Sequence, residues 1–136
     1  MIVEEVMSES PYVARVNDSL GRVMQMLTEA DVRHMPVVEE GALVGIISDR
    51  DVREMTPSAL EAAEHPDDLR KLLATPAGKV MNSDVVTIEP DAELVEAIDL
   101  MLEHKIGAIP VIEGGSRKLL GIVSYIDILR AAREYL

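Results

Sequence analysis

The hydrophobic positions of the chain follow one pattern that occurs twice. In each copy the apolar residues of a predicted helix lie at i, i+3, i+4 and i+7. These residues are Leu20, Val23, Met24 and Leu27 in the first copy, and Leu94, Ala97, Ile98 and Met101 in the second. A shift of 74 positions superimposes the two series, and a two-residue insertion raises the shift to 76 further along. The pattern therefore predicts two copies of one structural unit.

Each copy predicts the element order β-α-β-β-α. A short β segment precedes the amphipathic helix, two β runs follow it, and a last helix begins at a serine. The β segments are 12–14, 35–38 and 43–47 before Ser48, and 85–88, 109–112 and 119–123 before Ser124. Threonine–proline and histidine–proline pairs between the copies predict short connecting helices.

These elements predict an α/β (α+β) fold with three parts. Residues 1–55 form the first repeat, 56–76 a helical connector and 77–136 the second repeat. Neither repeat is large enough to close a core alone, so we expect the two to pack together as one compact module. The stripe of Met24, Met26 and Leu27 is available for that contact or for a homodimer, although a core role is more common for such stripes.

Composition and charge narrow the functional classes. The 136 residues include no cysteine, which excludes disulfide frameworks, thiolate metal sites and cysteine nucleophiles. The three histidines do not have the spacing of a zinc site. A net charge of −12 and only three aromatic residues disfavour nucleic-acid and anionic-membrane partners. No apolar run approaches the length of a membrane span, and the first residues are acidic. We therefore expect a soluble cytoplasmic protein without a bound metal.

One motif, Gly-hydrophobic-hydrophobic-Ser-x-x-Asp, occurs in both copies, at 45–51 and 121–127. A serine at a helix start with a carboxylate three residues later is typical of a capping box, which is the commoner explanation for the spacing alone. The same geometry also suits a nucleoside phosphate. The free N–H groups and the hydroxyl bind phosphate, and the carboxylate accepts both ribose hydroxyls.

The whole chain resembles a pair of cystathionine-β-synthase (CBS) domains, the Bateman module, of the small stand-alone prokaryotic type. The resemblance rests on the order, spacing and duplication of several elements. They are Val6-Met7 and Val80-Met81, the strings 34–38 and 108–112, and both copies of the Gly-hydrophobic-hydrophobic-Ser-x-x-Asp motif.

This resemblance implies two clefts that bind adenosine-containing ligands: AMP, ADP, ATP, NAD or S-adenosylmethionine. In the second copy, Asp127 would hold the ribose and Ser124 the phosphate, and the residues around the adenine would be Ala92, Ala97, Ile106, Gly107, Ala108 and Pro110. The matching set in the first copy is Asp18, Val23, Val32, Arg33, His34, Ser48 and Asp51. Arg50 is within reach of a phosphate there, but a local ion pair is the commoner role.

The two copies differ where the adenine would lie. Gly107 and Ala108 leave room for a flat purine, whereas Arg33 and His34 either fill the pocket or bind a phosphate. Asp18 replaces Ala92 and adds a negative charge that opposes phosphate binding. We therefore expect the second copy to hold the better adenosine site.

The leading functional interpretation is a regulatory module that senses nucleotide or energy state. Its ligand would change the packing of repeats or protomers in a disc-like homodimer and so regulate an unidentified effector protein. The alternative is a ligand-free CBS module that only mediates oligomerisation, with both Ser–Asp pairs acting as caps. An enzyme is the weakest hypothesis, because no nucleophile, base or metal set is evident; we predict no catalytic residue and no required cofactor.

Overall fold

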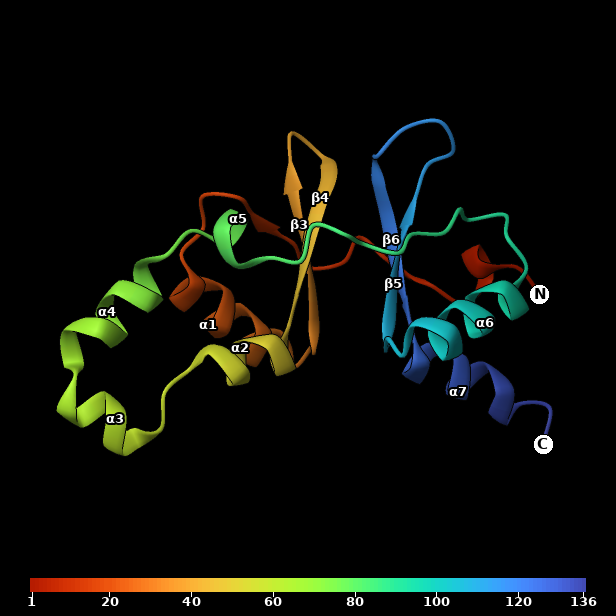
Figure 1. The fold of residues 1–136 in the computed structure, drawn as a ribbon. Helices are drawn as coiled ribbons and strands as arrows, with labels where there is room; N and C mark the ends of the chain where they lie inside the picture. The colour runs from red at the N-terminus through yellow and green to blue at the C-terminus, as the bar shows by residue number, and fades with distance from the viewer. The chain divides into compact units, whose positions relative to one another are not determined.

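A computed structural model describes residues 1–136 and divides them into two compact units (Figure 1). The N-terminal unit comprises Tyr12–Glu39 and Val44–Ser83. The C-terminal unit comprises Met1–Pro11, Glu40–Leu43 and Asp84–Leu136. Each unit contains a three-stranded sheet with helices, which confirms the α/β class.

The N-terminal unit is built on the sheet β2-β3-β4, in which β2 runs parallel to β3. Its elements are β2 (Ala14–Arg15), α1 (Leu20–Ala30), β3 (His34–Glu39), β4 (Ala42–Ser48), α2 (Asp49–Met55), α3 (Ala59–Glu64), α4 (Pro66–Ala74) and α5 (Ala77–Val80). Leu20, Val23 and Leu27 of α1 are buried against the sheet. Met24 and Met26 pack against the same core, which confirms the core role of that stripe.

The C-terminal unit repeats this design on the sheet β1-β6-β5, whose pairings are antiparallel. Its elements are a 3-10 helix (Val3–Glu5), β1 (Ser8–Glu9), α6 (Leu94–His104), β5 (Ala108–Ile112), β6 (Leu119–Ser124) and α7 (Tyr125–Arg133). Helix α6 buries Ala97 and Met101 against Ile109, Val111 and Val123 of the sheet. No helix in the structure has the length and apolar character needed to cross a bilayer.

The segment before each repeat pairs with the sheet of the other repeat. Ser8 of β1 lies opposite Ile122 of β6, and the equivalent Asn82 lies opposite Ile46 of β4. The repeated Val-Met pair ends just before each of these residues. Residues 1–11 therefore belong to the C-terminal unit in space, although they precede the first repeat in sequence.

The first β segment of each repeat is shorter than its hydrophobic pattern predicts. The first copy has β2 at Ala14–Arg15, and the second copy keeps only a parallel bridge between Ile88 and Val111. Each segment lies at a sheet edge and has a neighbouring strand on one side only. Because a segment with one neighbouring strand forms few interstrand hydrogen bonds, neither segment forms a long strand, although its apolar residues still pack against the core.

Candidate functional site

The Ser–Asp pair of the C-terminal unit lies where β6 ends and α7 begins. The Asp127 amide donates to the Ser124 hydroxyl at 3.2 Å, and the Ser124 amide donates to Asp127 Oδ2 at 2.9 Å. The Ser124 hydroxyl also lies 3.0 Å from the same carboxylate oxygen. This is a complete capping box, so both residues have the structural role that their spacing predicts.

Two further segments meet this helix start. The Tyr125 amide donates to the Gly107 carbonyl at 3.0 Å, and Ala108 lies opposite Ser124 in the sheet. On the other side of β6, the Ser8 hydroxyl of β1 donates to Asp127 Oδ1 at 3.4 Å. Gly107, Ala108, Ser124 and Asp127 are therefore brought together as expected, and Ser8 joins them.

Ser8 is the site residue that sequence reasoning missed. It directly follows the repeated Val6-Met7 pair, so the repeat itself marks its position. The local sequence does not indicate that this segment pairs with β6, because that partner lies more than 100 residues further along the chain.

Several other predicted residues of the second copy contribute to the core. Ala97 is fully buried on α6, and Pro110 is fully buried in the middle of β5. Ala92 packs against the same core, and its carbonyl accepts a hydrogen bond from the Val3 amide at 2.9 Å. Ile106 also packs there, after the left-handed residue Lys105 that ends α6. The side chains of Ala97 and Pro110 present no surface to a ligand in this structure.

The N-terminal unit repeats the capping arrangement at α2. The Asp51 amide donates to the Ser48 hydroxyl at 3.0 Å, and the Ser48 amide donates to Asp51 Oδ2 at 3.3 Å. The Asp49 amide donates to the Arg33 carbonyl at 2.8 Å, so the loop before β3 again meets the helix start. Val32 of that loop packs against the core.

Charged side chains distinguish this second arrangement from the first. Burial lowers the pKa of His34, and the nearby Arg33 guanidinium lowers it further. The carboxylates of Asp51 and Asp49 act in the opposite direction, but the net effect is a lowered pKa. Arg50 is exposed and pairs with Glu54 at 3.3 Å, as the local ion-pair interpretation predicts. The place of Gly107 and Ala108 is thus taken here by an exposed arginine and a half-buried histidine.

Asp18 has a turn-forming role in the structure. Its carboxylate accepts a hydrogen bond from the Arg15 amide at 2.8 Å, and its carbonyl accepts one from the Ala77 amide at 2.7 Å. These bonds join the end of β2 to the start of α5. No cluster of three or more histidine or carboxylate side chains suited to a metal ion occurs in the chain.

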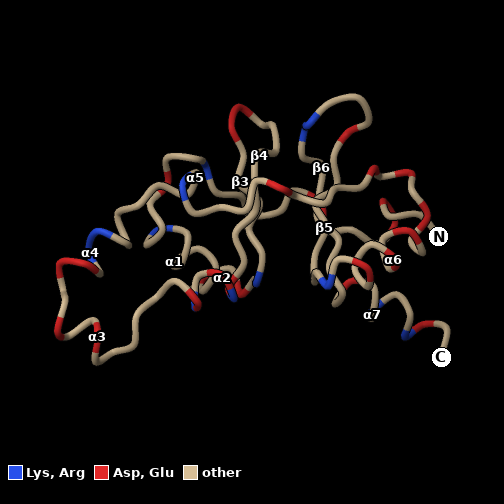
Figure 2. The backbone as a smooth tube through the Cα atoms, viewed as in Figure 1, with Lys and Arg blue, Asp and Glu red and all other residues tan.

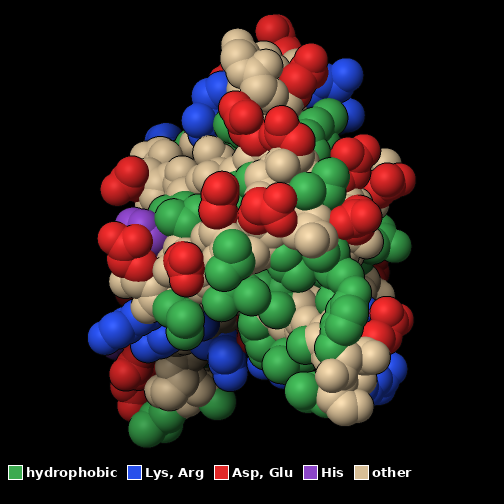
Figure 3. Space-filling view, turned by 90° about the vertical axis from the view of Figure 1, so that its right-hand side faces the viewer, with side chains coloured by type: hydrophobic (Ala, Val, Ile, Leu, Met, Phe, Trp, Pro, Cys, Tyr) green, Lys and Arg blue, Asp and Glu red, His purple; other side chains and the backbone are tan.

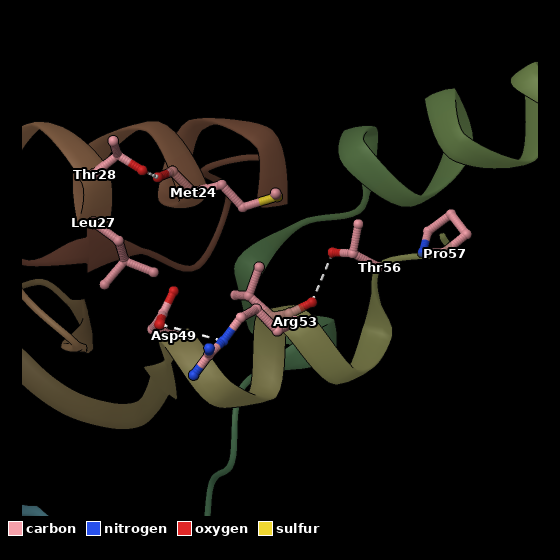
Figure 4. A pocket seen from close by; sticks show the side chains of 8 residues that line it. Met24, Leu27, Thr28, Asp49, Arg53, Thr56 and Pro57 are labelled. Atoms are coloured by element: carbon pink, nitrogen blue, oxygen red, sulfur yellow. Dashed lines mark hydrogen bonds and ion pairs between the residues drawn. The ribbon is translucent and has the colours of Figure 1, made fainter. Parts of the chain in front are cut away.

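Each unit also has a groove between two of its helices, α1 and α2 in the N-terminal unit and α6 and α7 in the C-terminal unit. The groove between α1 and α2 has a volume of about 310 Å³, and Asp49 and Arg53, both on α2, form an ion pair at 3.4 Å on one side of it (Figure 4). The groove between α6 and α7 has a volume of about 360 Å³ and is lined mainly by apolar residues, including Leu94, Ile98 and Ile128.

Comparison with known proteins identifies the repeated unit. The CBS domain family model matches residues 3–57 and 77–134. A CBS domain-containing protein of Dictyostelium discoideum is 33% identical over 130 residues, covering 95% of this chain and 89% of the relative. Some other curated relatives are much longer, and the chain spans only 31% and 14% of two of them.

Two solved structures similar to the whole chain contain adenosine compounds. The CBS domain pair of protein MJ0100, in complex with 5′-methylthioadenosine and S-adenosyl-L-methionine, has a TM-score of 0.80 and 25% identity, covering 100% of this chain and 98% of that one. CBSX2 in complex with AMP has a TM-score of 0.80 and 26% identity, covering 98% and 97%. The resemblance found in the sequence is confirmed: this chain belongs to the CBS domain family and carries two copies of the domain.

Proposed function

We propose that this protein is a regulatory module that binds an adenosine-containing ligand and passes the binding event to a partner protein. The observation that carries the proposal is the meeting of Ser124 and Asp127 with Gly107 and Ala108 at the start of α7. The helix start offers positive potential to a phosphate or another anionic group, and the carboxylate suits ribose hydroxyls. The small residues beside them leave space for a flat base.

The similar structures support the ligand class. AMP, 5′-methylthioadenosine and S-adenosyl-L-methionine share an adenosine and differ in the group at the 5′ position. A site in which a carboxylate binds the ribose and backbone groups bind the base would recognise the adenosine that these ligands share. We therefore propose adenosine as the recognised element and leave the 5′ group open.

We further propose that the module works as a homodimer in the cytoplasm, without catalysis and without a required cofactor. The lack of cysteine supports a location in the cytoplasm, which is a reducing compartment. The lack of an evident nucleophile–base pair supports a binding role, in which the output passes through an effector protein.

A ligand-free oligomerisation module is the second candidate function. The complete hydrogen bonding of both capping boxes favours it, because Ser48, Asp51, Ser124 and Asp127 then need no ligand to explain them. The two candidates differ in what happens when the carboxylate of Asp127 is replaced.

The test compares Asp127→Asn and Asp127→Ala by isothermal titration with AMP and S-adenosylmethionine. Asparagine keeps an acceptor for the Ser124 amide, so stability should change little, whereas alanine removes the cap interaction and should cost about 1 kcal/mol. Both variants should lose adenosine affinity by roughly tenfold to a hundredfold, since a hydrogen bond to a charged group contributes about 1.5–3 kcal/mol.

Asp51→Asn is the matched control in the first copy. It should weaken binding less, because Arg33 and His34 stand there in place of the small residues Gly107 and Ala108, and we propose the second copy as the better adenosine site. Wild-type protein that binds neither ligand after removal of copurified nucleotide would favour the oligomerisation module instead.

A further inference from the structure

The carboxylate of Asp127 has little free capacity to accept hydrogen bonds in this structure. A carboxylate has two oxygens with two acceptor sites each, four sites in total. The Ser124 amide and the Ser124 hydroxyl both donate to Oδ2, at 2.9 and 3.0 Å, and the Ser8 hydroxyl donates to Oδ1 at 3.4 Å. Three of the four sites are therefore occupied, and one site on Oδ1 is left.

No cationic side chain competes for these acceptor sites. Asp127 takes part in none of the ion pairs of the chain. The basic residues of α7, Arg130 and Arg133, lie in its last turn, whereas the carboxylate lies in its first turn (Figure 2). The number of free acceptor sites on this carboxylate therefore depends on Ser8 and Ser124.

A ribose needs more acceptor sites than Asp127 has free. The 2′ and 3′ hydroxyls each donate one hydrogen bond, so a carboxylate that binds both must offer two acceptor sites. With one site free, one of the three existing bonds has to break. The bond from Ser8 is the longest of the three, and both bonds from Ser124 join the two residues of the capping box of α7. The bond from Ser8 is therefore the one that a ribose displaces.

We propose that the Ser8 hydroxyl is a latch on Asp127 that a ribose has to open, so that Ser8 sets how well the site distinguishes ribose from 2′-deoxyribose. The proposal rests on the proposed function, because the latch belongs to the same site. A 2′-deoxyribose has only the 3′ hydroxyl, which fits the remaining acceptor site without displacing Ser8. A ribose gains a second bond to the carboxylate but breaks the one from Ser8, so wild type should discriminate only weakly between the two sugars.

The segment that carries Ser8 is weakly held at its C-terminal end. Strand β1 consists of Ser8 and Glu9, which are both exposed, and it forms the edge of its sheet. Ser10 has a left-handed backbone with a φ of 48°, and Pro11 is the last residue before the chain enters the N-terminal unit. Met7, in contrast, packs against the hydrophobic core. Opening the latch therefore loosens residues 8–11, one of the chain connections between the two units, while Met7 stays in place.

Isothermal titration with adenosine and 2′-deoxyadenosine tests the latch on the sugar alone. Neither compound has a phosphate, which is useful because the net charge is −12 and acidic side chains are prominent on the face of the molecule in Figure 3. Ser8→Ala removes the latch and should bind adenosine roughly threefold to tenfold more tightly than wild type, the usual effect of one hydrogen bond. Its affinity for 2′-deoxyadenosine should be unchanged.

Ser8→Thr and Ser116→Ala are the matched controls. Threonine keeps a hydroxyl at the latch, and Ser116 is an exposed serine of the same unit, in the turn between β5 and β6. Both variants should bind the two nucleosides as wild type does. AMP and 2′-deoxy-AMP repeat the comparison with a phosphate present. Weaker adenosine binding by Ser8→Ala, or an equal gain for both sugars, would overturn the latch.

Hydrogen exchange detects the latch independently of affinity. Adenosine should speed the exchange of the amides of residues 8–10 in wild type, and 2′-deoxyadenosine should leave it unchanged. Ser8→Ala should show the faster exchange without any ligand. Slower exchange of these amides in the presence of adenosine would show that β1 closes on the ligand instead of leaving Asp127, and would reject the proposal.

Two patterns of binding separate the latch from the proposed function. If wild type and Ser8→Ala bind none of the four compounds while circular dichroism shows both to be folded, the proposed function is overturned together with the latch. If both proteins bind adenosine and AMP but Ser8→Ala has no gain that depends on the 2′ hydroxyl, the proposed function stands and only the latch is overturned.

Discussion

Both carboxylate oxygens of Asp127 have partners in the structure. Oδ2 accepts from the Ser124 amide, and Oδ1 accepts from the Ser8 hydroxyl. The bond from Ser8 is long, at 3.4 Å, and both residues of this contact are accessible from solvent. A ribose hydroxyl can therefore replace Ser8 at Oδ1 while the cap on α7 stays intact. Capping and ligand binding are compatible roles for this residue.

In the N-terminal unit, His34 stands at the position that matches Ala108 and makes stability depend on pH. Burial lowers its pKa below the ordinary value of 6.5, so in the window below that value the unfolded chain binds a proton more readily than the folded chain. Stability should therefore fall as the pH decreases from about 7 towards 5. Melting temperatures at pH 7.5 and 5.5 measure the effect.

His34→Gln should reduce this loss of stability, and His65→Gln, in the exposed connector, should leave it unchanged. Equal acid sensitivity of the wild type and of His34→Gln would show that carboxylates alone cause the pH dependence.

At the scale of the secondary-structure elements, β1 packs directly over Gly121 of its neighbour β6. A Cβ added to Gly121 of β6 would lie 2.7 Å from the Ser8 carbonyl oxygen and 2.9 Å from Met7 Sδ. Gly45 of β4 is covered in the same way by Met81. The glycine of the repeated motif is therefore needed because a methionine-bearing segment packs directly over it.

Gly121→Ala should destabilise the protein by about 1–3 kcal/mol, the usual cost of adding a methyl group where backbone cannot yield. Urea denaturation measures the difference. Gly114→Ala is the matched control, since the nearest atom there is the flexible side chain of Glu89 at 3.2 Å. Equal stability of the two variants would contradict the close packing of β1 on β6.

The sequence predicts those elements whose pattern is local. Helices α1 and α6 and strands β3 to β6 were predictable because their apolar residues either repeat at 3.6 positions or form short runs of strand length. The pairing of β1 with β6 was not predictable, because β6 is distant in the chain and the two residues of β1 are too few to show a periodic pattern. The spacing of Ser124 and Asp127 predicted the cap. The burial of Ala97 agrees with its place in the apolar stripe of α6, so the periodicity is the better guide there than the position that the family resemblance assigns to it as a site residue.

At the scale of the whole molecule, the two units have diverged from a common design. The C-terminal unit combines small residues at its candidate site with an apolar helix face, whereas the N-terminal unit carries charges at both places. Helix α7 joins the two features, since it begins at Ser124 beside the candidate site and exposes Leu129 further along.

The most direct test of the sensing role is a thermal-shift panel on nucleotide-free protein with AMP, ADP, ATP, NAD, S-adenosylmethionine, 5′-methylthioadenosine and GTP. A ligand at a hundredfold excess over its dissociation constant adds about 2.7 kcal/mol of stability, which corresponds to a shift of several degrees. The account predicts such a shift for at least one adenosine compound, none for GTP, and a shift reduced to about half or less in Asp127→Asn. A flat panel on folded protein, or an equal response in Asp127→Asn, would contradict it.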